Sequence, residues 1–419
     1  MKVRGEVRVP GDKSISHRAL ICAALSPERW RIRNVLVAAD TESTAGVLRS
    51  LGAEMPALGP DMSGRGAGLR GLRAPSAALD CGNSGTTARL MAGVVAAHDF
   101  VARFVGDASL SRRPMERVAE PLSAMGARIE LSDGGRLPMT VHGASLSRIE
   151  WDTRSASAQV KSAVLFAGLV AAEPVTVNET RRSRDHTERM LSALGVPITV
   201  HGTRVTLQPV HELAAPDFLI PGDPSSAAYF AALAALAGDG ELVIPDVCVN
   251  GTRFAFFAAL RAMGAAVERD DRRQRDGEDV ATLRVRPGRL GGITVGERDV
   301  PAMIDELPLL ACVAARAEGD TVITGAAELR VKESDRIAAV VSNLRALGAD
   351  VEELADGMRV VGGSAPLRGR VVTHGDHRLA MAFGVLARLP GNDIVIDDPD
   401  CVRVSYPGFW DDLDRAIAP

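Results

Sequence analysis

The sequence predicts an α/β protein of two domains, in which six units of about 70 residues are arranged as two sets of three. Three observations lead to this fold class. The chain of 419 residues is too long for one ordinary hydrophobic core and suits two domains. A polar opening followed by an Ala-rich helix recurs along the chain. An amphipathic helix that ends on glycine alternates with this first pattern.

The first pattern is a short polar segment that leads into an Ala-rich, apolar helix. Its six copies begin near Gly11, Gly82, Ser155, Gly222, Asp305 and Gly375. Successive copies lie about 70 residues apart, and this regular spacing indicates a repeated structural unit.

The second pattern is an amphipathic helix, a glycine and a β-like stretch. Its five full copies contain VLRSLGAEM from Val47, PLSAMGARIE from Pro121, MLSALGVPI from Met190, ALRAMGAAVE from Ala259 and NLRALGADVE from Asn343. In each copy the glycine suits a left-handed C-cap. A sixth copy, FWDDLDRAI, would lie at the C-terminus.

Two similar turns, VPGDK from Val9 and IPGDP from Ile220, lead into Ala-rich helices half a chain apart. We expect the chain to pass between the domains at these turns, because Gly and Pro suit a stiff hinge. One domain would comprise 1–10 plus 224–419, the other 13–221, with hinges at 10–13 and 221–224. The alternative is two ordinary strand-to-helix turns, which does not explain their equivalent places among the six units.

Composition limits the classes of partner. A net charge of −4 and a pI near 6.1 argue against nucleic acid, so any positive site is expected to be local. No apolar run has the length of a signal peptide or membrane span, which predicts a cytoplasmic protein. The five cysteines are odd in number and far apart, which suggests neither a disulfide framework nor a zinc site.

Lysine is rare in this chain, so its positions are informative. Of 49 lysines and arginines only four are lysines, namely Lys2, Lys13, Lys161 and Lys332. A lysine inside a motif therefore indicates a need for a compact ammonium or a titratable donor. In DKSISHRA, Lys13, Ser14 and Arg18 would gather at a helix N-terminus, where backbone N–H groups favour anions. This predicts a phosphate site, with a capped surface helix as the alternative.

Further loops offer polar or cationic side chains near helix starts. The loop GNSGTT, with Asn83 and Gly85, would let a ligand approach the backbone closely, although a plain capping loop fits equally well. Arg113 would hold a phosphate or remain solvated. The segments SASAQVKS and RRSRDHTERM add neutral partners and a cation, namely Ser157, Gln159 and Arg184.

The densest group of charges lies in ELRVKESDRIAAV. Apolar residues at helical spacing from Ile337 predict a core-facing helix that ends at Gly348, so Lys332, Glu333 and Arg336 crowd at its start. A helix dipole disfavours cations there unless an anion completes the site. Salt bridges between helices are the alternative.

Two other helix starts carry ionisable residues. Asp305 and Glu306 precede an apolar helix, where capping and acid–base chemistry are both open. His377 and Arg378 open the last Ala-rich helix. His374 and His377 have H-x-x-H spacing, but no clustered carboxylate or cysteine supports a metal, and none is expected.

Seven motifs together resemble one known family. PGDKSISHRA, GNSGTTAR, the Arg113-Pro114 step, SAQVKSA, DELP, RVKESDR and GDHRLAM, in this order over nearly the whole chain, closely resemble the 5-enolpyruvylshikimate-3-phosphate (EPSP) synthase family. The resemblance implies the enolpyruvyl transferase fold, in which two globular domains, each of three βαβαββ units around inward helices, close over the substrates. The implied reaction joins phosphoenolpyruvate to the 5-hydroxyl of shikimate 3-phosphate through a tetrahedral intermediate and expels inorganic phosphate. It uses no cofactor, and a monomer is expected.

The roles of individual residues follow from the resemblance alone. The shikimate 3-phosphate site would comprise Lys13, Ser14, Arg18, Ser157, Ala158, Gln159, Arg184, Asp305 and Lys332. The phosphoenolpyruvate site would comprise Lys13, Asn83, Gly85, Arg113, Gln159, Arg336 and Arg378. Asp305 resembles the base facing the 5-hydroxyl and Glu333 the acid serving the methylene carbon, while Lys13, the third catalytic residue, would meet both substrates.

Four positions depart from the best-known bacterial pattern of the family. Ala158 replaces a serine, Leu90 a proline, Glu328 an asparagine that binds shikimate, and Val404 a lysine that helps bind phosphate. These departures resemble the second, more divergent class of the family. Gly85 is the small residue usual in members sensitive to the inhibitor glyphosate, although Leu90 lies behind it.

Two other functions fit part of the pattern. The sister enzyme that transfers enolpyruvyl to UDP-N-acetylglucosamine relies on a reactive cysteine and a Lys-Asn pair, whereas here Ser14 follows Lys13 and the region of Arg113 has no cysteine. A catalytically silent protein that binds a phosphate ligand would tolerate the loss of Asp305 or Glu333, and both are present.

Overall fold

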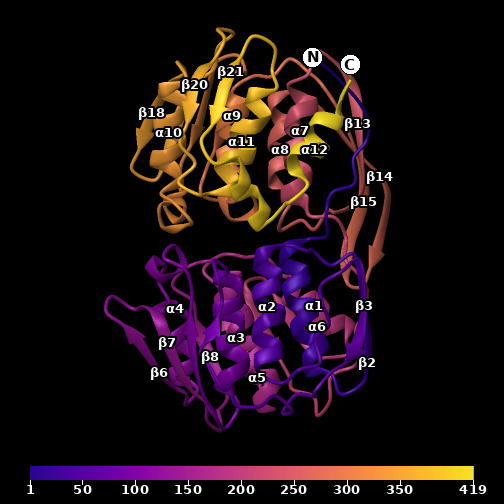
Figure 1. Ribbon diagram of the computed structural model, residues 1–419, viewed down its shortest axis with the longest axis vertical. Helices are drawn as coiled ribbons and strands as arrows, with labels where there is room; N and C mark the ends of the chain where they lie inside the picture. Colours follow the sequence, from indigo (N-terminus) through magenta and orange to yellow (C-terminus); the bar gives the residue numbers. More distant parts are fainter. Residues whose placement is uncertain (419) are drawn as a thin grey trace. The chain divides into compact units, whose positions relative to one another are not determined.

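The computed structural model describes residues 1–418, which form two compact units. Unit 1 comprises Met1–Pro10, Pro221–Gln274 and the chain from Asp279 onward, and unit 2 comprises Gly11–Ile220 and Arg275–Glu278. The sequence patterns do not separate Arg275–Glu278, the turn of a β-hairpin, from its flanks. Each unit contains three sheets with helices packed against them (Figure 1).

The sheets of unit 2 are mixed. The first pairs β12 (Asp217–Leu219), β2 (Arg29–Arg33) and β3 (Asp61–Arg65) in that order. The second has the order β4 (Leu79–Asp80), β5 (Val101–Val105), β7 (Arg136–His142) and β6 (Arg128–Ser132). The third has the order β8 (Ile149–Asp152), β9 (Val175–Asn178), β11 (Arg204–Leu207) and β10 (Ile198–His201). In both four-stranded sheets the first pair is parallel and the later pairs are antiparallel.

One four-stranded sheet of unit 1 has the same arrangement of one parallel pair followed by antiparallel pairs. A second, five-stranded sheet contains this arrangement and one further strand. The largest sheet has the order β14 (Ala266–Arg275), β15 (Glu278–Arg286), β13 (Asp239–Cys248), β1 (Lys2–Glu6) and β22 (Ile417–Ala418). The next has the order β16 (Thr294–Val295), β17 (Asp320–Ile323), β19 (Gly357–Val361) and β18 (Asp350–Leu354), and the last pairs β20 (Arg368–Val371) with β21 (Asp393–Ile396). The N-terminal strand β1 pairs in parallel with β13, with Val3 opposite Gly240, and therefore belongs to unit 1.

Helices are present at all six predicted Ala-rich positions. They are α1 (Lys13–Leu25), α3 (Gly85–Ala96) and α5 (Ala158–Ala171) in unit 2, and α7 (Pro224–Ala235), α9 (Leu307–Ala314) and α11 (His377–Ala387) in unit 1. In unit 2, α3 packs against both α1 and α5, and in unit 1 the three helices pack against one another. Nearly every residue of these helices is buried, which explains why they are apolar all round rather than amphipathic.

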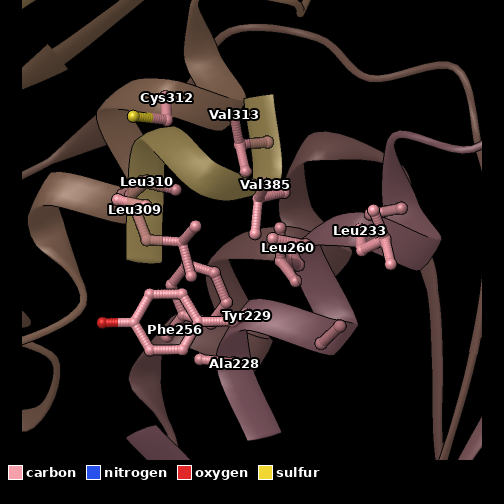
Figure 2. Packing of buried hydrophobic residues seen from close by; sticks show 14 of the residues in the cluster. Ala228, Tyr229, Leu233, Phe256, Leu260, Leu309, Leu310, Cys312, Val313 and Val385 are labelled. Carbon is pink, nitrogen blue, oxygen red and sulfur yellow. The ribbon is translucent and has the colours of Figure 1, made fainter. Parts of the chain in front are cut away.

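Helix and strand side chains form the core of unit 1, and Figure 2 shows the helix side chains of α7, α8 (Ala255–Met263), α9 and α11. Tyr229, Phe256, Leu260 and Leu310 are all at most 2% exposed. The ring of Tyr229 packs against these residues, whereas its hydroxyl points away from the labelled apolar group (Figure 2). This hydroxyl is free to meet a polar partner.

The second helix pattern is also present. The helices α2 (Ala39–Ser50), α4 (Glu116–Ala124), α6 (His186–Ala193), α8 and α10 (Arg336–Ala346) are each followed by a glycine at positive φ. The φ values of Gly52, Gly126, Gly195, Gly264 and Gly348 lie between 83° and 119°, so the predicted left-handed caps are confirmed. The last helix, α12 (Phe409–Arg415), leads into β22.

Side-chain caps set the starts of the helices that carry the predicted motifs. Asp12, Asp335 and Asp376 accept backbone N–H groups of α1, α10 and α11 at 2.8, 3.0 and 2.9 Å. These caps place the residues that follow them in the first helical turn. Short 3-10 helices span Leu110–Arg112, Val300–Ala302, Ala327–Val331 and Pro399–Val404. Within residues 1–418, none of the helices has the length and apolar character needed to cross a membrane.

Candidate active site

The predicted site residues divide between the two units. Unit 2 holds Lys13, Ser14, Arg18, Asn83, Gly85, Arg113, Ser157, Ala158, Gln159 and Arg184, and unit 1 holds Asp305, Lys332, Glu333, Arg336 and Arg378. Within each unit most of them are linked by hydrogen bonds or ion pairs, as the following contacts describe.

Lys13 opens α1 and is held by a carboxylate. Its ammonium lies 3.1 Å from the Asp40 carboxylate in the first turn of α2, and only 18% of its side chain is exposed. Asp40 lies outside the motifs identified in the sequence. The N-terminus of α1 favours negative charge. The contact with Asp40 holds the Lys13 ammonium near this terminus, where an anion would approach.

Arg18 lies one turn further into α1 and is buried. Its three nitrogens donate to neutral oxygens: the Ser14 carbonyl at 2.9 Å, Ser162 Oγ at 2.7 Å and Thr187 Oγ1 at 2.6 Å. Burial lowers the pKa of Arg18 to about 10, with Glu188 opposing and Arg184 adding to the shift. A guanidinium held by neutral partners, close to a second arginine, is suited to a multiply charged anion.

Gln159 connects the start of α5 with the start of α3. Its amide nitrogen donates to Thr86 Oγ1 at 2.9 Å, and its amide oxygen accepts a hydrogen bond from Arg89 at 2.7 Å. A Cβ atom on Gly85 would lie 2.7 Å from Arg89 Nη1. Any side chain at position 85 would therefore displace Arg89. Arg89 was not identified from the sequence, although it ends the motif GNSGTTAR.

Asn83 and Arg113 meet beside this contact. Arg113 donates to Asn83 Oδ1 at 2.6 Å, and Asn83 donates to Asp107 Oδ2 at 2.6 Å. The Cβ position of Gly85 lies 3.5 Å from Arg113 Nη1. The structure thus brings four residues predicted to bind phosphoenolpyruvate, Asn83, Gly85, Arg113 and Gln159, into one cluster around the start of α3.

The remaining predicted residues of unit 2 lie at the starts of α5 and α6. Ser157 caps α5 by accepting the N–H of Val160 at 3.4 Å, and Ala158 is the first helical residue. Arg184 lies two residues before α6, where its charge acts on Arg18.

In unit 1 the central residue is Arg336, at the start of α10. Its guanidinium donates to Asp376 at 2.8 Å, to Glu333 at 2.7 Å and to Asp305 at 3.3 Å. Its pKa is raised, because these three carboxylates outweigh the effect of burial. The two candidate catalytic carboxylates, Asp305 and Glu333, thus contact the same guanidinium. Asp376 was missed in the sequence, although its place before HRLAM is that of a helix cap.

Lys332 lies next to this carboxylate group and is half-buried. Burial lowers the pKa of its ammonium, with the charges of Asp305 and Glu328 opposing this shift and Arg336 reinforcing it. A lysine with a lowered pKa beside two carboxylates is a candidate for proton transfer.

Arg378 lies in the first turn of α11 and is 6% exposed. It lies 3.9 Å from the buried Glu306 carboxylate and is hydrogen-bonded to the Tyr229 hydroxyl. Burial opposes the charge of Arg378, but Tyr229, Asp305 and Glu306 raise its pKa. Burial in turn raises the pKa of Tyr229 to about 12. Asp305 therefore acts electrostatically on Lys332, Arg336 and Arg378.

The part of the chain that the structure describes contains no group of three or more histidine, cysteine, aspartate or glutamate residues arranged to hold a metal ion. The H-x-x-H pair, His374 and His377, accordingly lacks a third ligand among the described residues.

Comparison with known proteins identifies the chain's relatives. Residues 1–413 match the family model described as EPSP synthase (3-phosphoshikimate 1-carboxyvinyltransferase). The 3-phosphoshikimate 1-carboxyvinyltransferase of a Sulfurihydrogenibium species is 46% identical over 420 residues, which cover 99% of this chain and 97% of the relative. That of Acidithiobacillus ferrooxidans is 48% identical over 411 residues, covering 97% and 94%. A solved structure of EPSP synthase from Acinetobacter baumannii superposes with a TM-score of 0.86 at 38% identity, covering 99% of this chain and 96% of that one.

Proposed function

The chain belongs to the EPSP synthase (3-phosphoshikimate 1-carboxyvinyltransferase) family, and from this membership we propose which residues carry out the reaction. The enzyme transfers the enolpyruvyl group of phosphoenolpyruvate to shikimate 3-phosphate, on the pathway to the aromatic amino acids. The contact of Asp305 and Glu333 with the guanidinium of Arg336 is the observation that supports the assignment of roles most directly.

In the proposed addition step, Asp305 takes the proton of the 5-hydroxyl and the oxygen attacks C2 of phosphoenolpyruvate. Glu333 gives a proton to the methylene carbon, which becomes a methyl group in the tetrahedral intermediate. In the elimination step Glu333 takes a proton back from this methyl group, the bond from C2 to the phosphate oxygen breaks, and the proton held by Asp305 leaves with the phosphate. Each proton transfer accelerates its step by roughly 10²–10⁴. The lowered pKa of Lys332 makes it a second proton donor beside Glu333.

In the proposed binding mode, the cations of the two substrate sets neutralise the phosphates and carboxylates. Arg18 and Arg184, supported by Ser14, Ser157, Ala158 and Gln159, would bind shikimate 3-phosphate, together with Asp305 and Lys332. Arg113, Asn83, Gly85 and Gln159 would line the phosphoenolpyruvate pocket, and Arg336 and Arg378 would hold its carboxylate. Lys13 would meet both substrates. The clustering of Asn83, Gly85, Arg113 and Gln159 supports this division.

At the level of the whole chain, we propose six βαβαββ repeats in two domains, comprising 1–10 plus 224–419 and 13–221, with hinges at 10–13 and 221–224. The recurrence of one strand order in three four-stranded sheets supports the repeats. Ala158, Leu90, Glu328 and Val404 favour the second, divergent class of the family. We further propose that the enzyme acts as a cytoplasmic monomer without a cofactor. Sedimentation of the purified protein measures its molecular mass and tests whether it is a monomer.

The experiment that tests the reaction is release of inorganic phosphate from phosphoenolpyruvate. We expect release that requires shikimate 3-phosphate and continues without added metal or cofactor. UDP-N-acetylglucosamine serves as the matched second acceptor. Release that required the UDP-sugar would overturn the assignment, and saturable binding of shikimate 3-phosphate without any release would favour a silent binding protein.

A further inference from the structure

Lys161 lies inside the motif SAQVKSA, yet it belongs to neither substrate set. It is placed on α5 with a side chain only 1% exposed. Its ammonium lies 2.8 Å from Glu179, just after β9, and 2.7 Å from Glu188 on α6. Both carboxylates are at most 5% exposed, so the three residues form a buried ion triad.

The two carboxylates of this triad are held differently. Glu179 also accepts hydrogen bonds from the hydroxyl and the backbone N–H of Ser183. Glu188 Oε2 is buried and has no hydrogen-bond partner among residues 1–418. Burial raises the pKa of Glu188, an effect that Lys161 opposes, and the two carboxylates raise the pKa of Lys161 despite its burial. Lys161 is therefore the group that keeps Glu188 paired as a carboxylate.

The triad lies one residue away from the contacts of Arg18 on both helices. Ser162, which follows Lys161, accepts from Arg18 Nη2, and Thr187, which precedes Glu188, accepts from Arg18 Nε. Ser162 and Thr187 are also hydrogen-bonded to each other at 2.6 Å. Among the charges acting on Arg18, that of Glu188 is the strongest. Of the two carboxylates that act on Arg18, Glu188 and Asp12, Glu188 acts more strongly and is the one paired with Lys161.

We propose that Lys161 sets the affinity of the enzyme for shikimate 3-phosphate by keeping Glu188 paired, which leaves the charge of Arg18 available to the substrate phosphate. This inference rests on the proposed function, in which Arg18 binds that substrate. Lys161 does not contact the substrate in this proposal and is a positioning residue. One ammonium and two carboxylates give the triad a net charge of −1, and without the ammonium the charge is −2 when both carboxylates are ionised.

Binding of shikimate 3-phosphate, measured by titration calorimetry, tests the proposal through charge. At a pH above the raised pKa of Glu188, Lys161→Met should weaken binding on the order of tenfold or more, because the unpaired Glu188 carboxylate then acts on Arg18 in a poorly screened interior. Glu188→Gln alone should tighten binding. The double variant Lys161→Met/Glu188→Gln restores the net charge of −1 and should bind within about threefold of the wild type. Phosphoenolpyruvate KM should change little in all three variants.

The control for lost packing is Val164→Ala, one turn further along α5 at a fully buried position. It should lower the melting temperature but leave the Kd of shikimate 3-phosphate unchanged. A double variant that binds as weakly as Lys161→Met would overturn the proposal, because a packing role alone predicts no rescue. If Lys161→Met does not fold, Glu188→Gln decides: unchanged or weaker binding would overturn the proposal.

A separate variant tests the proposed role of Arg18 independently of the role of Lys161. Arg18→Gln should weaken binding of shikimate 3-phosphate by at least tenfold if Arg18 holds the phosphate. If Arg18→Gln binds normally, the assignment of Arg18 fails. If Arg18→Gln weakens binding while the Lys161 and Glu188 variants do not respond to charge, only the role of Lys161 fails.

Discussion

Asp305 and Glu333 contact the same guanidinium, yet their surroundings differ. Asp305 interacts with Lys332, Arg336 and Arg378, whereas Glu333 interacts with Lys332 and pairs with Arg336 three residues away. Three neighbouring cations keep a carboxylate ionised and ready to accept a proton. This ionised state is the one that the proposed role of Asp305 as the base requires, with Glu333 exchanging protons with carbon.

The first prediction concerns these two carboxylates. Asp305→Asn and Glu333→Gln keep the shape and remove the charge, so each should lower kcat by roughly 10² or more while substrate binding changes far less. Lys13→Met should weaken binding as well, because Lys13 is proposed to meet both substrates. In deuterated water the wild type should exchange deuterium into the methylene group of phosphoenolpyruvate when shikimate 3-phosphate is present. Exchange at the wild-type rate in Glu333→Gln would move the role of acid to Lys332 or Lys13.

His17 is the start of a buried chain of hydroxyl groups. Its Nδ1 lies 2.7 Å from Thr44 Oγ1, which lies 2.7 Å from Thr87 Oγ1, and Thr87 donates to Ser84 at 2.8 Å. Burial, and then the charges of Lys13 and Arg18, lower the pKa of His17 well below its usual range. Its Nε2 is buried without a partner among the described residues, so a proton added there would have no acceptor.

The buried His17 predicts that the folded protein loses stability in acid. Because the pKa of His17 is lower in the folded than in the unfolded state, the unfolded state binds the proton first, and stability is lost as pH falls below about 6.5. The loss should approach about 1.4 kcal/mol per pH unit, down to the lowered pKa. In urea unfolding at pH 7 and pH 5, His17→Asn should show a smaller difference than the wild type. The exposed His201 provides the control, and His201→Asn should keep the wild-type dependence.

At the scale of elements, the glycine that ends each amphipathic helix reverses the chain into the following segment. Gly195, after α6, has φ 83° and open space around its Cβ position. Gly264, after α8, has φ 119°, and a Cβ there would overlap the carbonyl oxygen of Arg289. Gly195 is therefore required for its positive φ alone, whereas Gly264 is required both for its positive φ and for the lack of a side chain.

These two glycines form a matched pair of variants. Gly195→Ala should lower the free energy of unfolding by about 1 kcal/mol, the cost of a side chain at positive φ. Gly264→Ala should cost about 2 kcal/mol or more, because strain and overlap with a backbone atom act together. Chemical denaturation of both variants measures the difference. Equal losses would show that space at position 264 is not limiting.

At the scale of the whole molecule, both domain sequences begin their Ala-rich helices with a PGD turn, and cationic helix starts occur in both. Positive helix termini and cations from different domains repel one another until anions neutralise them. We propose that substrate binding drives the two domains closer, with the turns at 10–13 and 221–224 absorbing the change.

Small-angle scattering tests this expectation. Saturating shikimate 3-phosphate should lower the radius of gyration, and adding inorganic phosphate alone should have a smaller effect because it bridges fewer groups. Lys2→Gln, at an exposed position on β1 outside both proposed substrate sets, is the control and should compact like the wild type. A radius of gyration that stays constant at saturation would contradict ligand-driven closure.

Features that depend on neighbouring residues can be predicted from the sequence alone. The six Ala-rich helices and the five left-handed glycines follow from periodicity and local hydrogen bonding, which operate within a few residues. The family motifs likewise identified the types of residue in the candidate site, because each motif is a short local segment.

Contacts between groups that lie far apart in the sequence depend on the tertiary structure. Arg89 is hydrogen-bonded to Gln159, 70 positions away in the sequence, and Arg336 to Asp376, 40 positions away. Lys161 pairs with Glu179 and Glu188, which lie outside its motif. Such contacts depend on how the helices pack, because a buried charge needs a partner and the packing determines which groups lie beside it. A lysine in a motif can therefore serve as a ligand or as a core ion pair, and its burial and its partners distinguish the two.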